Sequence, residues 1–424
     1  MRVLMAPGQM RPEPAGVPLY APGRGLDAPR AAGALARGWA GARPQDDVVE
    51  LPMADGAPGS AHCLPARRIL AREALQGHGP TGQIREIDLV HLSAAAPPGA
   101  GGGPAPAPTR ARDGGRDGIG GTWYLDAARL TALPADPDQA AQEAREGTTA
   151  GLGQVVAQAL ERLGPADTLV VGMARSAVND GGLGLLTSLA DSLGGLGAAR
   201  ALMRERSVGL ALADPIALGG VAGAGAGLVH LAGLGAQEAQ DLDRAACAQG
   251  ARVLSLARQA GGSGPLLLPV VGGAPARLSV TGWGTGAGGG AALALRALGA
   301  WARPGALVMA GLIGLQGALA DREVVLSACG EAYDVLADSL VAVVGASAAG
   351  RALPAILVAG RCAVPRGELA AAGISAAYAV EQMAGRGAGR RDDRRDAGWD
   401  DGTVEEVEAR VEAMGARLAR TWSR

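Results

Sequence analysis

The sequence contains no lysine and no phenylalanine, and Asn179 is its only asparagine. A P-loop nucleotide-binding site needs the lysine of its GxxxxGK[ST] motif, so the P-loop class of proteins is excluded. The 39 basic residues and 41 acidic residues give a net charge of −2. This balance provides no basic surface along which a nucleic-acid backbone could bind, so we expect no nucleic-acid partner.

Cysteine and histidine are also scarce, with four residues of each type scattered along the chain and no CxxC pair. Scattered cysteines are typical of reduced thiols in the cytoplasm and argue against a zinc site. Residues 1–10 contain no apolar signal-peptide segment. Residues 215–236 are uncharged over the length of a membrane span, but they are mostly glycine and alanine, which contribute little transfer energy. We therefore expect a cytoplasmic protein without a membrane partner.

What is present is 48% hydrophobic residues in a chain of 424, enough for a large core and two domains. Short apolar runs predict strands at 2–6, 48–51, 167–172, 207–213, 323–327 and 354–359. Helical spacing of apolar residues predicts helices at 26–41, 147–164, 181–193, 237–260, 291–301 and 403–422. Residues 339–349 fit either type, and residues 94–120 read as a flexible Pro/Gly-rich insert. Strands that alternate with helices predict an α/β fold with parallel sheets.

Parallel sheets bind ligands at the carboxyl ends of their strands, so the loops that follow strands are the candidate sites. Asp55 follows the second predicted strand in the sequence Pro-Met-Ala-Asp-Gly. An aspartate before a glycine is often only a turn residue, but it can equally hold Mg²⁺ or orient a hydroxyl group. Asp214 follows another strand and leaves the same two alternatives open.

Residues 172–182 form the most polar of these loops, between a strong strand and a predicted helix. Ser176 and Asn179 are suited to bind a carboxylate or hydroxyl groups, and Asp180 is suited to act on a proton or a metal ion. The alternative is a helix cap with permissive glycines. Because Asn179 is retained in a composition that disfavours asparagine, we favour the functional interpretation.

A glycine run at residues 282–290 precedes the predicted helix at 291–301. Its GxGxxG-like spacing has little weight in a chain with 69 glycines. A loop whose backbone amides cradle phosphate groups is still a reasonable interpretation. A nicotinamide-dependent oxidoreductase would require such a glycine motif directly after the first strand, where residues 7–11 offer none.

In chain order, these loops resemble the motifs of the bacterial glycerate kinase family. Residues 52–60 read PMADGAPGS, where the family has PMADGGEGT. Residues 172–184 read GMARSAVNDGGLG, where the family has GIGGSATNDGGAG. Residues 370–378, AAAGISAAY, are similar to the family's AAAGIDAAY. The resemblance covers nearly the whole chain except its Pro-rich inserts.

The resemblance implies two α/β domains, with a Rossmann-like parallel-sheet domain (1–62 and 291–424) interrupted by a second α/β domain (63–290). It implies an ATP-dependent kinase that phosphorylates glycerate, or a similar small hydroxy acid, in the cleft between the domains, with Mg²⁺ as cofactor. The implied residues are Asp55, Asp180 and Asp214 for catalysis, Asp180 and Asp214 for the metal, Arg175, Ser176 and Asn179 for the substrate, and Gly284, Gly286 and Gly288 for the nucleotide. A homo-oligomer is left open.

The chain departs from the family at several charged positions. Residues 6–11, APGQMR, stand where the family has APDSFK, so that Gly8 replaces an aspartate and the nearby lysine has become Arg11 or is lost. Residues 230–236 lack the glutamine and lysine of the family's FGPQKGA, and Glu331 is displaced from the corresponding glutamate. Phosphoryl transfer depends on positioned charge, so these losses leave a second hypothesis open. The chain would then be a pseudoenzyme that binds a ligand or a partner without catalysis.

Overall fold

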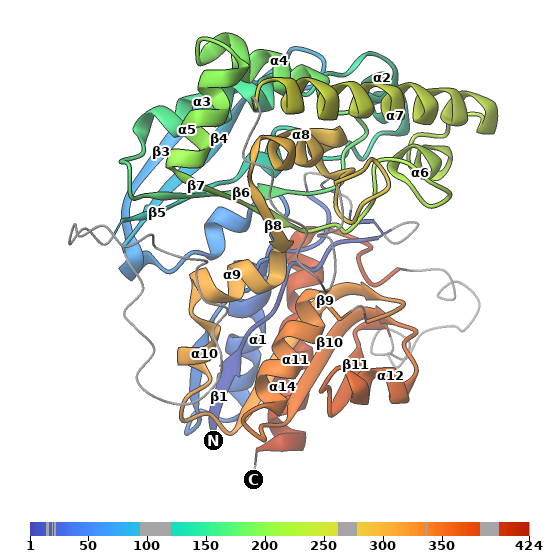
Figure 1. Cartoon of the computed structure of the whole chain (residues 1–424). Helices are drawn as coiled ribbons and strands as arrows, with labels where there is room; N and C mark the ends of the chain where they lie inside the picture. The colour runs from blue at the N-terminus through green and yellow to red at the C-terminus, as the bar shows by residue number, and fades with distance from the viewer. Residues whose placement is uncertain are drawn as a thin grey trace, which may run out of the picture.

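The computed structural model describes residues 1–13, 17–18, 20, 23–93, 120–261, 278–335, 337–381 and 398–423. The predicted insert at 94–120 lies outside this part of the chain, apart from Gly120. Two α/β domains, each built on its own sheet, lie one above the other in Figure 1. The predicted fold class, a parallel-sheet domain interrupted by a second α/β domain, is therefore confirmed.

The first domain contains a five-stranded sheet in which every neighbouring pair is parallel. Its strands are β1 (Arg2–Met5), β2 (Asp47–Glu50), β9 (Val324–Ala332), β10 (Ala355–Cys362) and β11 (Ala376–Ala379). Their spatial order is β2-β1-β9-β10-β11. The chain thus leaves β1 toward one edge of the sheet and leaves β9 toward the other, which defines a doubly wound sheet with a switch point between β1 and β9.

Helices cover both faces of this sheet because side chains on the buried strands point alternately to either side. Val3 and Met5 of β1 face α1 (Ala28–Ala42) and α14 (Val404–Trp422). Leu4 of β1 belongs to the core on the other face. That face is covered by α9 (Gly305–Ile313), α10 (Leu315–Ala318), α11 (Leu340–Ala349) and α12 (Arg366–Ala371).

Both helices on the first face begin within two residues of the predicted starts at 26 and 403. Asp27 caps α1 by accepting a hydrogen bond from the Arg30 amide. Thr403 and Glu406 form a capping box at the start of α14. The ambiguous segment 339–349 is α11, capped by Ser339. Its valines are buried around most of the helix, and for this reason their spacing could not distinguish a helix from a strand.

Gly38 of α1 allows the close packing of α1 against α14. A Cβ atom at Gly38 would lie 1.9 Å from the Glu412 carbonyl oxygen, whereas one at Gly41 of the same helix would meet nothing within 4 Å. We expect Gly38→Ala to lower the free energy of unfolding by about 1–3 kcal/mol or more, because the helices must move apart. Gly41→Ala, the matched control, should raise it by about 0.5–1 kcal/mol through helix propensity. Urea denaturation of both variants measures the difference, and equal effects would contradict the close packing.

The second domain contains a six-stranded sheet in the order β3-β4-β5-β6-β7-β8. Its strands are β3 (Ile69–His78), β4 (Ile84–Leu92), β5 (Thr122–Leu125), β6 (Thr168–Met173), β7 (Ser207–Leu212) and β8 (Trp301–Pro304). The β3–β4 and β4–β5 pairs are antiparallel, and the remaining pairs are parallel. Strands β3, β4, β5 and β8 are not predicted by the sequence patterns.

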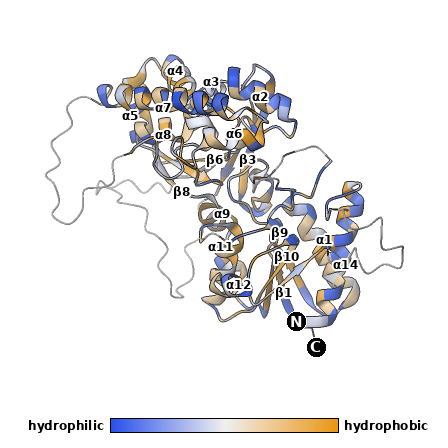
Figure 2. Cartoon of the chain, turned by 90° about the vertical axis from the view of Figure 1, so that its right-hand side faces the viewer, coloured by the Kyte–Doolittle hydropathy of each residue, from blue (hydrophilic) through white to orange (hydrophobic). Residues whose placement is uncertain are grey.

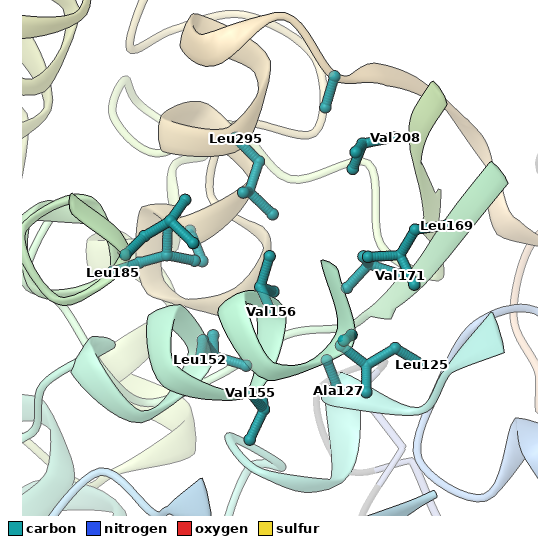
Figure 3. Close-up of a cluster of buried hydrophobic side chains, with 14 of the residues drawn as sticks. Leu125, Ala127, Leu152, Val155, Val156, Leu169, Val171, Leu185, Val208 and Leu295 are labelled. Carbon is teal, nitrogen blue, oxygen red and sulfur yellow. The ribbon is translucent and has the colours of Figure 1, made fainter. Parts of the chain in front are cut away.

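One face of the six-stranded sheet packs on helices, and Figure 3 shows this core. The helices of the domain are α2 (Pro137–Glu146), α3 (Ala150–Arg162), α4 (Leu183–Ser192), α5 (Leu196–Glu205), α6 (Ala224–Leu231), α7 (Ala236–Gln259) and α8 (Ala291–Leu298). Helix α2 is largely hydrophilic, and α7 mixes hydrophilic with hydrophobic residues, as the blue and orange in Figure 2 show. Within the described ranges, we find no helix whose length and apolar character would let it cross a bilayer.

The other face of the six-stranded sheet packs on the first domain. Tyr124, Val170 and Ala211 of this sheet share one hydrophobic core with Leu4 and Met53. The two sheets are thus joined by a continuous apolar layer. Helix α8 and strand β8 belong to the second sheet and its core, which moves the later domain boundary from the predicted residue 290 to about residue 304. Strand β8, which follows the glycine run and α8, has no sequence signal because Trp301–Pro304 is short and only partly buried.

Candidate active site

The carboxyl edge of the five-stranded sheet opens on a cavity of about 300 Å³, which we call the cleft cavity. Its walls come from the loops after β1 and β2, the start of α1, and single residues before α2 and at the start of α11. The lining residues include Gln9, Arg11, Tyr20, Asp27, Met53, Asp55, Gly59, Ser60, His62, Cys63, Arg129 and Leu340. Doubly wound sheets bind ligands at the carboxyl ends of their strands, and the cleft cavity lies there, beside the switch point between β1 and β9.

Asp55 is the one predicted catalytic residue that lines the cleft cavity. Its Oδ1 accepts a hydrogen bond from the Ala57 amide at 3.0 Å. Burial raises the pKa of Asp55, and the charge of Asp214 raises it further. The loop rests directly on the second sheet, since a Cβ atom at Gly56 would lie 2.3 Å from the Ala211 carbonyl oxygen. Asp55 is therefore a partly desolvated carboxyl group held at the junction of the two domains.

Arg11 brings positive charge to the same cavity. Its guanidinium group lies 5.2 Å from the centroid of the Tyr20 ring, in a cation–π arrangement. Arg11 Nε donates to Gln9 Oε1 at 3.3 Å, and Nη1 donates to the Arg24 carbonyl at 3.0 Å. Gln9 in turn donates to the Tyr20 hydroxyl at 2.5 Å. These contacts fix the guanidinium group, which is suited to bind an anion because its donors form a planar fork.

Arg175 and Asp214 form a two-point ion pair between the loops that follow β6 and β7. Arg175 Nε lies 2.7 Å from Asp214 Oδ2, and Nη2 lies 3.1 Å from Oδ1. Asp214 Oδ1 also accepts from the Ile216 amide at 2.9 Å. The structure thus brings Asp214 near enough to Asp55 to raise its pKa, but it occupies the Asp214 oxygens with protein donors.

Asn179 and Asp180 line a different cavity, of about 920 Å³, among α3, α4 and α7. Asp180 accepts hydrogen bonds from the Thr149 amide at 2.7 Å and the Gly182 amide at 2.9 Å. The hydroxyl groups of Thr148 and Thr149 and the Gly184 amide donate to it as well. Asp180 therefore joins the first turns of α3 and α4. The structure does not bring it into the cleft cavity with Asp55.

Substitution of Asp180 separates its structural role from a catalytic role. We expect Asp180→Asn to lower the free energy of unfolding by about 1–3 kcal/mol, because an amide cannot accept all of these hydrogen bonds. Asp191→Asn is the matched control, since Asp191 is an exposed aspartate that lines the same cavity. Thermal unfolding measures both. Unchanged stability of Asp180→Asn together with lost turnover would instead support the predicted catalytic role.

The remaining predicted substrate residue, Ser176, is buried, and its hydroxyl oxygen accepts from the Val178 amide at 3.2 Å. The Nδ2 atom of Asn179 is also buried and has no hydrogen-bond partner within the described chain. Arg175 is the most accessible of the three, with 20% of its side chain exposed. The three residues predicted to bind the substrate are therefore spread along one loop. Arg175 lies beside Asp214, and Asn179 lies at the other end of the loop.

The glycine run packs against the neighbouring loops. The amides of Gly284, Gly286 and Gly288 donate to the carbonyl groups of Pro215, Ile216 and Ala174. A Cβ atom at Gly286 would lie 2.6 Å from the Ala217 carbonyl oxygen. The three predicted nucleotide-binding amides are thus already paired. Because these glycines have no side chains, the loops can pack closely against one another.

The residues predicted to hold Mg²⁺ do not fit a resident metal ion. Asp180 is saturated by hydrogen-bond donors, and Asp214 is paired with Arg175. Across residues 1–423, excluding the ranges that the structure leaves undescribed, no three His, Cys, Asp or Glu side chains gather as metal ligands. A Mg²⁺ ion commonly binds through one or two carboxylates and the phosphates of its nucleotide, so it can still arrive with a substrate.

Two acidic features beside the cleft cavity are not predicted by the sequence patterns. Asp126 directly follows β5, has no exposed surface, and has a pKa raised to about 7 by burial. An aspartate after an apolar strand is the signal that identified Asp214, but β5 itself was not predicted. Glu13 has a pKa raised to about 8, first by burial and then by the charge of Glu331. No sequence pattern links Glu13 to Glu331, which lies at the end of β9.

The fold and the site define a two-domain α/β protein with a polar, charged cavity between its domains. The model of the glycerate kinase family matches residues 24–201 and 272–388. The chain therefore belongs to the glycerate kinase family.

The chain is also similar to curated proteins and to a solved structure. The chain is 29% identical over 394 residues to an uncharacterized protein of Mycobacterium bovis and, equally, to one of Mycobacterium tuberculosis. Each match covers 91% of this chain and 85% of the relative. The crystal structure of a "putative glycerate kinase 2" from Salmonella typhimurium LT2 matches with a TM-score of 0.59 at 19% identity. That match covers 99% of this chain and 98% of the other, and it shows the common fold.

Proposed function

We propose that the chain transfers a phosphoryl group from ATP to glycerate or a similar small hydroxy acid. Family membership supports kinase chemistry, and the observation that carries the proposal is the cleft cavity. It places Asp55, Arg11 and Arg129 around one space of about 300 Å³, and Arg129 also forms an ion pair with Asp88, with Nη1 3.3 Å from Oδ2. A carboxyl group can accept the proton of a reacting hydroxyl, and guanidinium groups can bind an anionic substrate.

Asp55 is the best-placed group to accept a proton. A base works best when its pKa lies near the working pH, and the raised pKa of Asp55 moves it in that direction. Arg11 and Arg129 would bind the substrate carboxylate or the transferred phosphoryl group, since the chain has no lysine for this purpose. Mg²⁺ would enter bound to ATP, as part of the substrate. This assignment does not depend on Asp180 or on the glycine run.

The test is ADP release by purified protein with D-glycerate and MgATP. We expect turnover that depends on D-glycerate, with no release when D-glycerate is left out. A thermal unfolding curve on the same sample shows that the protein is folded. A folded sample that releases no ADP with D-glycerate or with other small hydroxy acids would exclude the kinase proposal.

A second candidate function is ligand binding without catalysis. The occupied oxygens of Asp180 and Asp214 and the loss of the family's lysine favour it. Isothermal titration with D-glycerate and with MgATP distinguishes the two candidates when it is combined with the turnover assay. Binding without ADP release supports the pseudoenzyme, and binding with release supports the kinase.

A further inference from the structure

Asp126 connects the end of β5 to the loop that carries Asp55. Its Oδ2 accepts hydrogen bonds from the Gly59 amide at 3.0 Å and the Ala61 amide at 3.3 Å. Its Oδ1 is buried and has no hydrogen-bond partner in the described part of the chain. Asp126 belongs to the second domain, whereas Gly59 and Ala61 belong to the first. This carboxyl group therefore bridges the two domains directly behind the cleft cavity.

The hydrogen bonds continue from Asp126 toward Asp55 through the loop itself. Between the two amides that Asp126 holds lies Ser60, whose hydroxyl accepts from the Gly56 amide at 3.1 Å and donates to the Ala57 carbonyl at 2.6 Å. The Ala57 amide in turn donates to Asp55 Oδ1 at 3.0 Å. Each of these hydrogen bonds restricts the backbone of the loop between residues 55 and 61. The position of the Asp55 carboxyl group is thereby tied to Asp126.

Burial of a carboxyl group is costly unless it is hydrogen-bonded, and here one of its two oxygens has no partner. An apolar side chain would fill the space without the cost of burying a carboxyl group, but it would leave the Gly59 and Ala61 amides without this acceptor. What an apolar residue cannot do is accept hydrogen bonds from the two amides of the neighbouring domain. The presence of a buried aspartate, despite its cost, therefore indicates that Asp126 places the loop by binding these two amides.

We propose that Asp126 is a positioning residue that holds residues 55–61 so that Asp55 faces the cleft cavity. This inference rests on the proposed function, because it assigns Asp126 an effect on the phosphoryl transfer that Asp55 assists. Asp126 itself does not line the cavity, so in this proposal it acts through the loop and not on the substrate.

The test compares Asp126→Leu, Asp126→Asn and Asp167→Leu. Leucine removes the acceptor at position 126, whereas asparagine retains one acceptor oxygen for the two amides. Asp167 is the matched control, since it accepts from the Gly121 amide at 2.7 Å and the Gly164 amide at 2.9 Å at the opposite end of the same strands. All three proteins are compared at a temperature at which circular dichroism shows them to be folded.

We expect Asp126→Leu to lower kcat by about 100-fold with a much smaller change in KM, because a displacement of about 1 Å of a reacting group has this effect. Asp126→Asn should recover most of the loss. Asp167→Leu should unfold at a lower temperature but retain its kcat. Equal loss of kcat in Asp126→Leu and Asp167→Leu would overturn the proposal, since it would show a general effect of instability.

Two further measurements do not depend on turnover. Hydrogen exchange of the Gly59 and Ala61 amides should be faster in Asp126→Leu than in Asp126→Asn or in the parent chain. The carboxyl carbon of Asp55, followed by NMR, should titrate closer to its ordinary range in Asp126→Leu. If the parent chain releases no ADP, the kinase proposal fails while these measurements still test the placement of the loop. Unchanged exchange and unchanged titration would overturn the role of Asp126.

Discussion

Replacement of Asp55 with asparagine is expected to lower kcat for phosphoryl transfer by about 10²–10⁴-fold, the usual contribution of a positioned acid or base. The amide has nearly the same shape as the carboxyl group and can still accept from the Ala57 amide, so the loop should keep its conformation. It cannot take up the proton of a substrate hydroxyl. The expected result is therefore a loss in kcat with little change in melting temperature.

The control for this prediction is Asp321→Asn. Asp321 is an exposed aspartate in the turn before β9, and its φ of 60° is a conformation that asparagine adopts readily. Steady-state ADP release measures kcat for both variants, and thermal unfolding measures their stability. If Asp55→Asn retained the parent kcat, another group would have to accept the proton, and the assignment of Asp55 would be wrong.

The second large effect is expected in the pH dependence of stability. The pKa of Asp126 is about 7 in the folded protein, against an ordinary value of 3.8. Burial is the main cause, whereas the Gly59 and Ala61 amides and the Arg129 charge lower the pKa, and the Asp88 charge raises it. Tyr20, Tyr124 and Cys63 also face Asp126, and its negative charge raises the pKa of each.

Whether the free energy of unfolding rises or falls with pH depends on whether the folded or the unfolded state binds the proton. Between pH 4 and pH 7 the folded protein keeps a proton on Asp126 that the unfolded chain releases. Asp126 therefore contributes stability that is complete below pH 4 and is lost as the pH rises through about 7. The shift corresponds to a change of roughly 4 kcal/mol as an upper bound, at 1.36 kcal/mol per pKa unit.

Asp126→Asn isolates this contribution because asparagine does not titrate. The free energy of unfolding of Asp126→Asn, minus that of the parent chain, should rise by up to roughly 3 kcal/mol between pH 4.5 and pH 8. Every other titrating group is shared by the two proteins and largely cancels. Urea denaturation at a series of pH values measures the difference. A difference independent of pH would show that Asp126 is already ionised in the folded protein at low pH.

Several features of the protein follow from local sequence alone. The strands around Leu4 and Val170 were predictable because short apolar runs form buried parallel strands. The start of α1 was predictable because Asp27 pairs with an amide three residues away. The loop that carries Asp55 was predictable because its motif is contiguous. Such signals depend on residues close together in the chain, so they can be read without the fold.

The edges of the second domain were harder to predict. Strands β3 and β4 are half-exposed at the margin of their sheet and mix charged with apolar residues, which weakens the pattern. Without them, β5 was missed, and with it Asp126. Strand β8 joins its sheet only through β7, more than 80 residues earlier in the chain, and has no local signal of its own.

By itself, the sequence determined the alternation of strands and helices, the family and the set of polar loops from which a site can be built. Only the tertiary structure decided which polar groups meet. It turned Asp180 toward Thr149, paired Asp214 with Arg175, left Asp55 facing the cleft cavity and placed Asp126 behind it. The physical reason is that the surroundings of a carboxyl group depend on donors and burial supplied by distant segments, which no local pattern encodes.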